Sequence, residues 1–113
     1  MLKIKRVYEQ VSPEDGKRIL VDRLWPRGIK KEDAAIDEWL RDIAPSTELR
    51  KWYSHDPAKW GEFKKRYKME LKDRMGVIDR LRRESKKRTI TLLFSAKATE
   101  LNNAVALKEF IER

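Results

Sequence analysis

The stretch that decides the fold is "TITLLFSA", Thr89 to Ala96, which is the most apolar continuous run in the 113-residue chain. Its length and its β-branched residues are typical of a strand that is buried on both faces. Such strands occupy the middle of parallel sheets whose two faces are both covered. We therefore predict that this stretch forms a central strand.

Two further strands are predicted earlier in the chain. The segment "LKIKRVY", residues 2–8, alternates apolar and basic residues, and this period of two is typical of a strand. The segment "KRILVDRL", residues 17–24, is a short β-branched run between the turn "SPEDG" and the rigid "PRG". Both segments are predicted to lie beside the central strand.

The segments between these strands carry apolar residues at helical spacing, in steps of three and four. They cover residues 31–43, 60–71, 75–81 and 101–111. Ser46 is a candidate N-cap for one more short helix, and Asp56 followed by Pro57 marks the start of the helix at 60–71. Thr99 is the candidate cap of the last helix.

Strands separated by long helical stretches need crossover connections, which join parallel rather than antiparallel neighbours. The sequence therefore predicts the α/β class. We expect one domain over residues 1–113, three-layer-like, with a mostly parallel sheet of about three to four strands flanked by helices. Residues 44–71 are expected to form an irregular helical excursion from it.

The composition excludes several classes of site. The chain has no cysteine, so disulfides, thiol nucleophiles and thiolate metal sites are absent. His55 is the only histidine, which removes metal sites that need two imidazoles. No apolar run is long enough to span a bilayer, and the N-terminus lacks the apolar core of a signal peptide. We expect a cytoplasmic protein with no membrane association.

Polar and charged residues follow two of the predicted strands and form the candidate site. In open parallel sheets, ligands bind outside the carboxyl ends of the strands, where helix N-termini also arrive. A helix N-terminus attracts anions, and an arginine binds a phosphate through two parallel hydrogen bonds. We therefore predict a site for a small anionic ligand, phosphorylated or nucleotide-like. Its candidate binding residues are Arg23, Trp25, Arg27, Lys97 and Asn102.

Four residues are candidates for catalysis, because their types serve as nucleophiles, bases and acids. They are Asp22, His55, Ser95 and Glu100. Ser95 as a nucleophile with His55 as its base requires the two side chains to meet in space, which a sequence does not show. Asp22 has an equally good structural explanation, in which it pairs with an arginine at a strand end. Whether the protein is an enzyme stays open, and no cofactor is indicated.

The net charge of +9 suggests an alternative, nucleic-acid binding. More than half of the excess lies in "RLRRESKKR", residues 80–88, where six basic residues accompany one acidic residue. The candidate phosphate contacts are Arg80, Arg82, Arg83, Lys86, Lys87 and Arg88. A third alternative is a structural or partner-binding module that uses Trp39, Trp52 and Trp60. The oligomeric state is not indicated.

Four segments in order resemble the YeaO-like family, which is catalogued as domain of unknown function 488. They are "VDRLWPRG", "WLRDIAPSTELRKWYSHDP", "FKKRY" and "LLFSAKATELNNAVALKEF". The resemblance implies a small prokaryotic cytosolic α/β protein, and the family has no agreed reaction. Members often have "TEHN" where this chain has "TELN", so Leu101 removes an imidazole.

Overall fold

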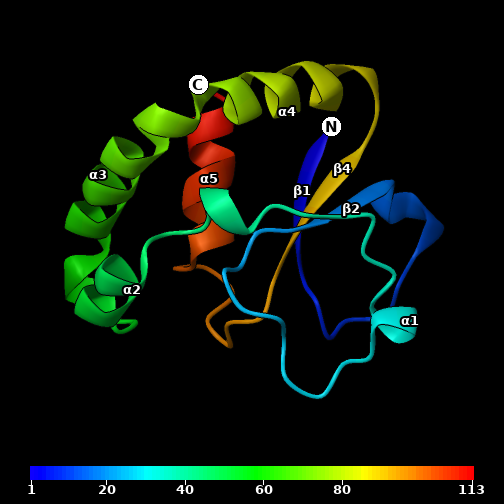
Figure 1. The fold of residues 1–113 in the computed structure, drawn as a ribbon, viewed down its shortest axis with the longest axis horizontal. Coiled ribbons are helices and arrows are strands. Elements are labelled where there is room, and N and C mark those ends of the chain that lie inside the picture. The colour runs from blue at the N-terminus through cyan, green and yellow to red at the C-terminus, as the bar shows by residue number, and fades with distance from the viewer.

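A four-stranded, all-parallel sheet forms the centre of the computed structural model, which describes residues 1–113 (Figure 1). Its strands are β1 (Leu2–Arg6), β2 (Lys17–Leu20), β3 (Glu38–Trp39) and β4 (Ile90–Phe94). Their order is β1-β4-β2-β3, so β4 is central as predicted, and all five of its residues are buried. Both β1 and β2 begin pairing at Ile90, so the carboxyl ends of these three strands are nearly level. The predicted α/β class is confirmed.

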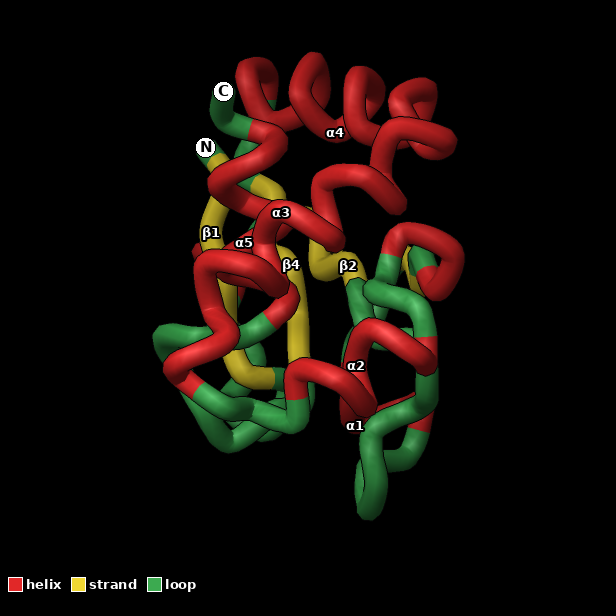
Figure 2. Tube along the Cα trace, turned by 90° about the vertical axis from the view of Figure 1, so that its left-hand side faces the viewer, coloured by secondary structure: helices red, strands yellow, loops and turns green.

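Five α-helices surround the sheet. They are α1 (Lys31–Ala34), α2 (Thr47–Tyr53), α3 (Trp60–Leu71), α4 (Met75–Lys87) and α5 (Asn103–Ile111). Helix α5 contacts β1 and β4 directly, while α3 and α4 pack against α5 (Figure 2). Helix α4 crosses above the amino edge of the sheet, and the opposite, carboxyl edge carries long loops (Figure 1). No helix is both long enough and apolar enough to cross a membrane.

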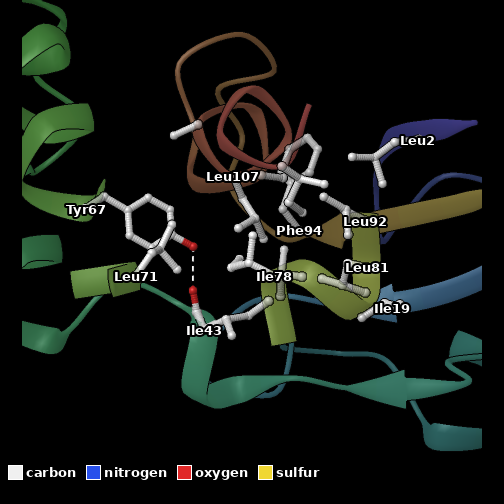
Figure 3. Close-up of a cluster of buried hydrophobic side chains, with 14 of the residues drawn as sticks. Leu2, Ile19, Ile43, Tyr67, Leu71, Ile78, Leu81, Leu92, Phe94 and Leu107 are labelled. Atoms are coloured by element: carbon white, nitrogen blue, oxygen red, sulfur yellow. Dashed lines mark hydrogen bonds between the residues drawn. The ribbon is translucent and has the colours of Figure 1, made fainter. Parts of the chain in front are cut away.

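The main core lies between the sheet and the helices (Figure 3). The strands contribute Leu2, Ile19, Leu92 and Phe94, and the helices contribute Tyr67, Leu71, Ile78, Leu81 and Leu107. Burial raises the pKa of Tyr67, so its hydroxyl stays neutral and donates to the carbonyl oxygen of Ile43. This bond ties α3 to the chain that leads into α2.

A second, smaller core covers the other face of the sheet. Val7, Leu20 and Leu93 pack there against partly buried side chains of β3 and of the long connection between β2 and β3. Those side chains are Trp25, Ile29, Ile36 and Trp39. The sheet is therefore covered on both faces, but the second cover is mostly an irregular loop with the one-turn helix α1.

The prediction of a continuous helix over residues 31–43 is wrong. Helix α1 stops after one turn, because Ala35 adopts a left-handed conformation with φ of 49°. The chain then pairs with the open edge of β2, where the N–H of Leu40 donates to the carbonyl of Leu20 at 2.9 Å. Trp39, which belongs to the predicted apolar stripe, instead packs on the second core from strand β3.

Most helix starts follow their predicted caps. Ser46 caps α2, and Asp56 caps the short 3₁₀ turn that precedes α3. The cap predicted at Thr99 is wrong, because residues before 103 form a loop. Asn102 is the actual N-cap of α5, and its side-chain oxygen accepts from the N–H of Val105 at 3.0 Å.

Ion pairs hold α4 against the amino edge of the sheet. Arg80 binds Glu38 at 2.8 Å and Glu84 at 3.0 Å. Lys17 contacts the same two carboxylates at 3.1 and 3.3 Å, and Arg88 contacts Glu84 at 3.3 Å. Burial opposes ionisation of Glu84, but the hydrogen bonds from the three cations together outweigh it and lower its pKa to about 2.

A buried ionic cluster lies on the face of the sheet beneath the second cover. Asp15 binds Arg18 at 2.6 Å and Lys5 at 3.0 Å, and both Asp15 and Arg18 are at most 5% exposed. The guanidinium of Arg18 also donates to the carbonyls of Ala34 and Ala35, both at 3.0 Å. Arg18 thereby fixes the end of α1 on the sheet.

Candidate functional site

Asp22 is the centre of the candidate site at the carboxyl edge. Strand β2 ends at Leu20, earlier than the predicted residue 24, and Asp22 follows in the loop. One carboxylate oxygen accepts from the N–H of Ser95 at 2.8 Å and from its hydroxyl at 2.7 Å. The other accepts from the side-chain amide of Asn103 at 3.1 Å. Asp22 forms no ion pair with an arginine, which was the alternative explanation of this residue; neutral groups donate to both of its oxygens.

The four catalytic candidates are only partly brought together. Asp22 and Ser95 are in contact, but neither forms a hydrogen bond with His55. His55 is exposed at the end of α2 with φ of 55°, and its ring lies beside that of Tyr53, with 5.8 Å between centroids. Glu100 is exposed in the loop before α5. The serine therefore has no imidazole base in contact, which nucleophilic catalysis of the expected kind requires.

Arg23 turns away from Asp22, toward the chain that leads into α2. Its Nε donates to the carbonyl of Pro45 at 3.2 Å, and one terminal nitrogen donates to that of Ala44 at 3.0 Å. The same segment is held by Glu70 of α3, whose carboxylate accepts from the N–H and the hydroxyl of Ser46. Arg23 is thus positioned by neutral carbonyl oxygens.

The "WPRG" loop contains the partly buried Trp25 and the exposed Arg27. The indole of Trp25 donates to the carbonyl of Ile29 at 2.8 Å and meets the edge of Trp39, with 5.5 Å between centroids. Trp25 therefore belongs to the second core. The side chain of Arg27 is exposed, and its carbonyl accepts from the hydroxyl of Tyr8 at 2.8 Å.

The loop after β4 supplies the remaining candidates. Lys97 is exposed and forms no ion pair. Asn102 is buried, because its side chain caps α5 and donates to the carbonyl of Ala98 at 2.8 Å. Asn102 therefore positions the first turn of α5 and offers no free polar atom to the surface.

Sequence reasoning missed two residues of this edge. Arg6 ends β1, and its Nε donates to the carbonyl of Ala96 at 2.9 Å, beside Lys97. Trp39 ends β3, and its indole donates to the carbonyl of Asp22 at 2.7 Å. Arg6 could have been found, since the last residue of any parallel strand lies at this edge. Trp39 could not, because its segment was predicted to be helical.

The cations of the carboxyl edge have no acidic partners. Arg6, Arg23, Arg27 and Lys97 take part in none of the ion pairs of the protein. Two of the four are oriented by backbone carbonyl oxygens, which carry no net charge. These four side chains therefore keep their positive charge, although the fold fixes the position of two of them.

The basic tract 80–88 divides into two groups. Arg80 and Arg88 are in the ion-pair network, and Arg82 donates to the carbonyls of Ile111 and Phe110 at the end of α5. The second group is exposed and unpaired, and it consists of Arg83, Lys86 and Lys87. Half of the tract thus stabilises the fold.

A broad surface hollow of about 600 Å³ lies at the amino edge, opposite the candidate site. Residues 13–17 and 88–89 and Asp37 line it, and none of the lining side chains is hydrophobic. No three acidic, histidine or cysteine side chains gather where they could hold a metal ion.

The fold and the site define an α/β protein with a small parallel sheet, whose carboxyl edge is tied together by a hydrogen-bonded aspartate. The chain belongs to the DUF488 family, since the family model described as "Inactive DUF488-N3 subclade" matches residues 1–113. The resemblance seen in the sequence is thereby confirmed.

Curated relatives span nearly the whole chain. The uncharacterized protein YeaO of Escherichia coli (strain K12) is 46% identical over 110 residues, covering 97% of this chain and 96% of its own. The uncharacterized protein Rv3073c of Mycobacterium tuberculosis is 38% identical over 110 residues, covering 97% and 92%. The uncharacterized protein Mb3100c of Mycobacterium bovis shows the same values. No solved structure matches the chain.

Proposed function

We propose that this protein is a non-catalytic binding domain that holds a small anionic molecule, phosphorylated or nucleotide-like, at the carboxyl edge of its sheet. The observation that carries the proposal is the charge of this edge. Arg6 and Arg23 are oriented by carbonyl oxygens, and Arg27 and Lys97 are exposed. Because no carboxylate pairs with them, an incoming anion meets positive charge without first displacing an internal partner.

Three observations support a non-catalytic role. Asp22 accepts hydrogen bonds from Ser95 and Asn103 and forms none with His55, so no relay of aspartate, histidine and serine is assembled. Leu101 stands where family members often have histidine, which leaves the loop without an imidazole. The matching subclade is itself described as inactive.

Thermal unfolding in the presence of phosphate, sulfate and mononucleotides tests the proposal, because a ligand that binds only the folded state raises Tm. We expect a rise that grows with ligand concentration and that is lost in the variant Arg27→Gln with Lys97→Gln. The matched control, Lys86→Gln with Lys87→Gln, removes the same charge from α4 and should keep the rise. No rise at about 10 mM ligand, or an equal rise in the first variant, would contradict the proposal.

The same samples test the absence of catalysis. We expect no release of phosphate or base from the mononucleotides above the background rate. Turnover that disappears in Ser95→Ala but persists in the control pair would show that the protein is an enzyme.

Nucleic-acid binding through α4 is the second candidate function. One observation favours it: Arg83, Lys86 and Lys87 are exposed, unpaired and spaced so that they share one face of the helix. Neutralising all three should flatten the salt dependence of binding, because fewer counterions are released. Arg82 is unsuited to this test, since it holds the end of α5.

A further inference from the structure

Two arginines stacked on aromatic rings stand at opposite ends of the carboxyl edge. The guanidinium carbon of Arg6 lies 4.7 Å from the ring centroid of Tyr8, and that of Arg41 lies 3.9 Å from the ring centroid of Trp39. Arg6 ends β1 and Trp39 ends β3, and these are the two outer strands of the sheet. The two pairs therefore mark the two limits of the edge.

The loop "LWPRG" connects the two pairs into one surface, which we call the edge band. At one end the hydroxyl of Tyr8 binds the carbonyl of Arg27, and at the other end Trp25 packs against Trp39. Leu24, which directly precedes Trp25, is 65% exposed. The band consists of Arg6, Tyr8, Leu24, Trp25, Arg27, Trp39 and Arg41.

The edge band carries positive charge along its whole length. Arg6, Arg27 and Arg41 take part in no ion pair, although Arg6 and Arg41 are ordered by their aromatic partners. The carboxylate of Asp22 faces Ser95 and Asn103 and is already hydrogen-bonded. The carboxylate of Glu9 accepts from the backbone N–H of Arg6 at 2.9 Å but forms no ion pair with its guanidinium. The band is therefore a strip of guanidinium groups that have no ion-pair partners, with aromatic rings between them.

The extent of the band decides which anion it fits. The outer strands are three strand spacings apart, about 14 Å, so one phosphate group cannot contact both arginine pairs. A chain of phosphates is long enough to contact both pairs. Stacked guanidinium planes also accept bases on their free faces while their N–H groups bind phosphate oxygens. Positive grooves with aromatic side chains are the usual surface for single-stranded nucleic acid.

We propose that the ligand of the carboxyl edge is a short single-stranded oligonucleotide that lies along the edge band, from Arg6 and Tyr8 to Trp39 and Arg41. This inference rests on the proposed function, since it names the class of anion bound at the same site. The cations of α4 are not part of this contact.

Fluorescence anisotropy with labelled oligothymidylate and oligouridylate of about ten nucleotides tests the inference at several salt concentrations. The variant Arg27→Gln with Arg41→Gln removes two exposed cations from the band. We expect binding at least about tenfold weaker, and a salt slope smaller by about 1.4, because each lost contact to a single strand contributes about 0.7. The control, Arg83→Gln with Lys87→Gln, removes two exposed cations from α4 and should change affinity less than about threefold.

Each result has a defined meaning, provided that Tm shows both variants to be folded. Equal losses in the two variants, or a larger loss in the control, would overturn the inference in favour of α4. If mononucleotides bind as tightly as the oligonucleotides, the inference fails while the proposed function stands. If neither phosphate, mononucleotide nor oligonucleotide binds, both fail.

Discussion

The two edges of the sheet use their cations in different ways. At the amino edge, Lys17, Arg80 and Arg88 pair with carboxylates, and Lys5 and Arg18 pair with Asp15 beneath the second cover of the sheet. At the carboxyl edge, the arginines are held by carbonyl oxygens and aromatic rings, or they are exposed. Each of these cations therefore has a carboxylate partner, whereas the cations of the carboxyl edge have none.

This difference has a simple physical basis. A carboxylate both orients a guanidinium and cancels its charge, whereas a carbonyl oxygen orients it and leaves the full charge in place. Cations of the first kind stabilise the fold. Cations of the second kind keep their full charge, which is the basis of the anion binding that we propose at that edge.

The largest effect on stability is expected for the buried ion pair between Asp15 and Arg18. Asp15→Ala leaves Arg18 buried without its carboxylate, and we expect a loss of about 3 to 5 kcal/mol in the free energy of unfolding. Urea denaturation measures it. Glu14→Ala is the control, because Glu14 is exposed and forms no ion pair, and it should cost less than about 0.5 kcal/mol. Equal losses would show that the fold is not stabilised by this cluster.

A smaller loss is expected at the carboxyl edge. Asp22→Ala removes the acceptor of three hydrogen bonds from Ser95 and Asn103, and we expect about 2 to 3 kcal/mol of destabilisation. Ser95→Ala removes only the hydroxyl bond and should cost about 1 kcal/mol. A loss for Asp22→Ala below that of Ser95→Ala would contradict the structural role of the aspartate.

Acid should destabilise the amino edge. Burial opposes ionisation of Glu84 and Glu38, but their hydrogen bonds to cations lower both pKa values, that of Glu84 from 4.5 to about 2. Since the folded-state pKa is lower than the unfolded one, this stabilisation is present above about pH 4.5 and is lost as the pH falls toward 2. Glu84→Gln should cost about 1 kcal/mol at neutral pH. Its Tm should then fall less between pH 5 and pH 2 than that of the unmodified protein.

The smallest effect on stability is expected for an exposed cation of the carboxyl edge. Arg27→Gln removes no ion pair, so the free energy of unfolding should change by less than about 0.5 kcal/mol. Arg80→Gln at the amino edge breaks pairs with Glu38 and Glu84 and should cost about 1 kcal/mol. If thermal unfolding ranks the two variants the other way round, the contrast between the edges is wrong.

Periodicity predicted the elements whose environment is uniform along their length. Strand β4 is buried at all five residues, and α3 buries Phe63, Tyr67 and Leu71 on one face. The parallel order followed from the long connections, and it correctly placed Asp22 near Ser95. The prediction of a helix over residues 31–43 failed, although their apolar spacing suits a helix. The open edge of β2 offered this part of the chain backbone hydrogen bonds instead.

The basic tract 80–88 shows that a count of charged residues does not predict which of them are paired. Counting residues gave six cations in 80–88, all equally suited to bind phosphate. The structure removes Arg80 and Arg82 from that set, because their partners, Glu38 and the last turn of α5, are distant in sequence. A charge is free or paired according to what the fold places next to it.

The sequence by itself determined the α/β class, the central strand and the edge at which polar loops meet, because these depend on local periodicity and on the connections that parallel strands require. Only the tertiary structure decided that Arg23 faces α2, that Arg6 joins the edge, and that the cations there keep their charge. Those facts depend on which carbonyl, ring or carboxylate each guanidinium reaches across the fold, and no local pattern in the chain specifies that contact.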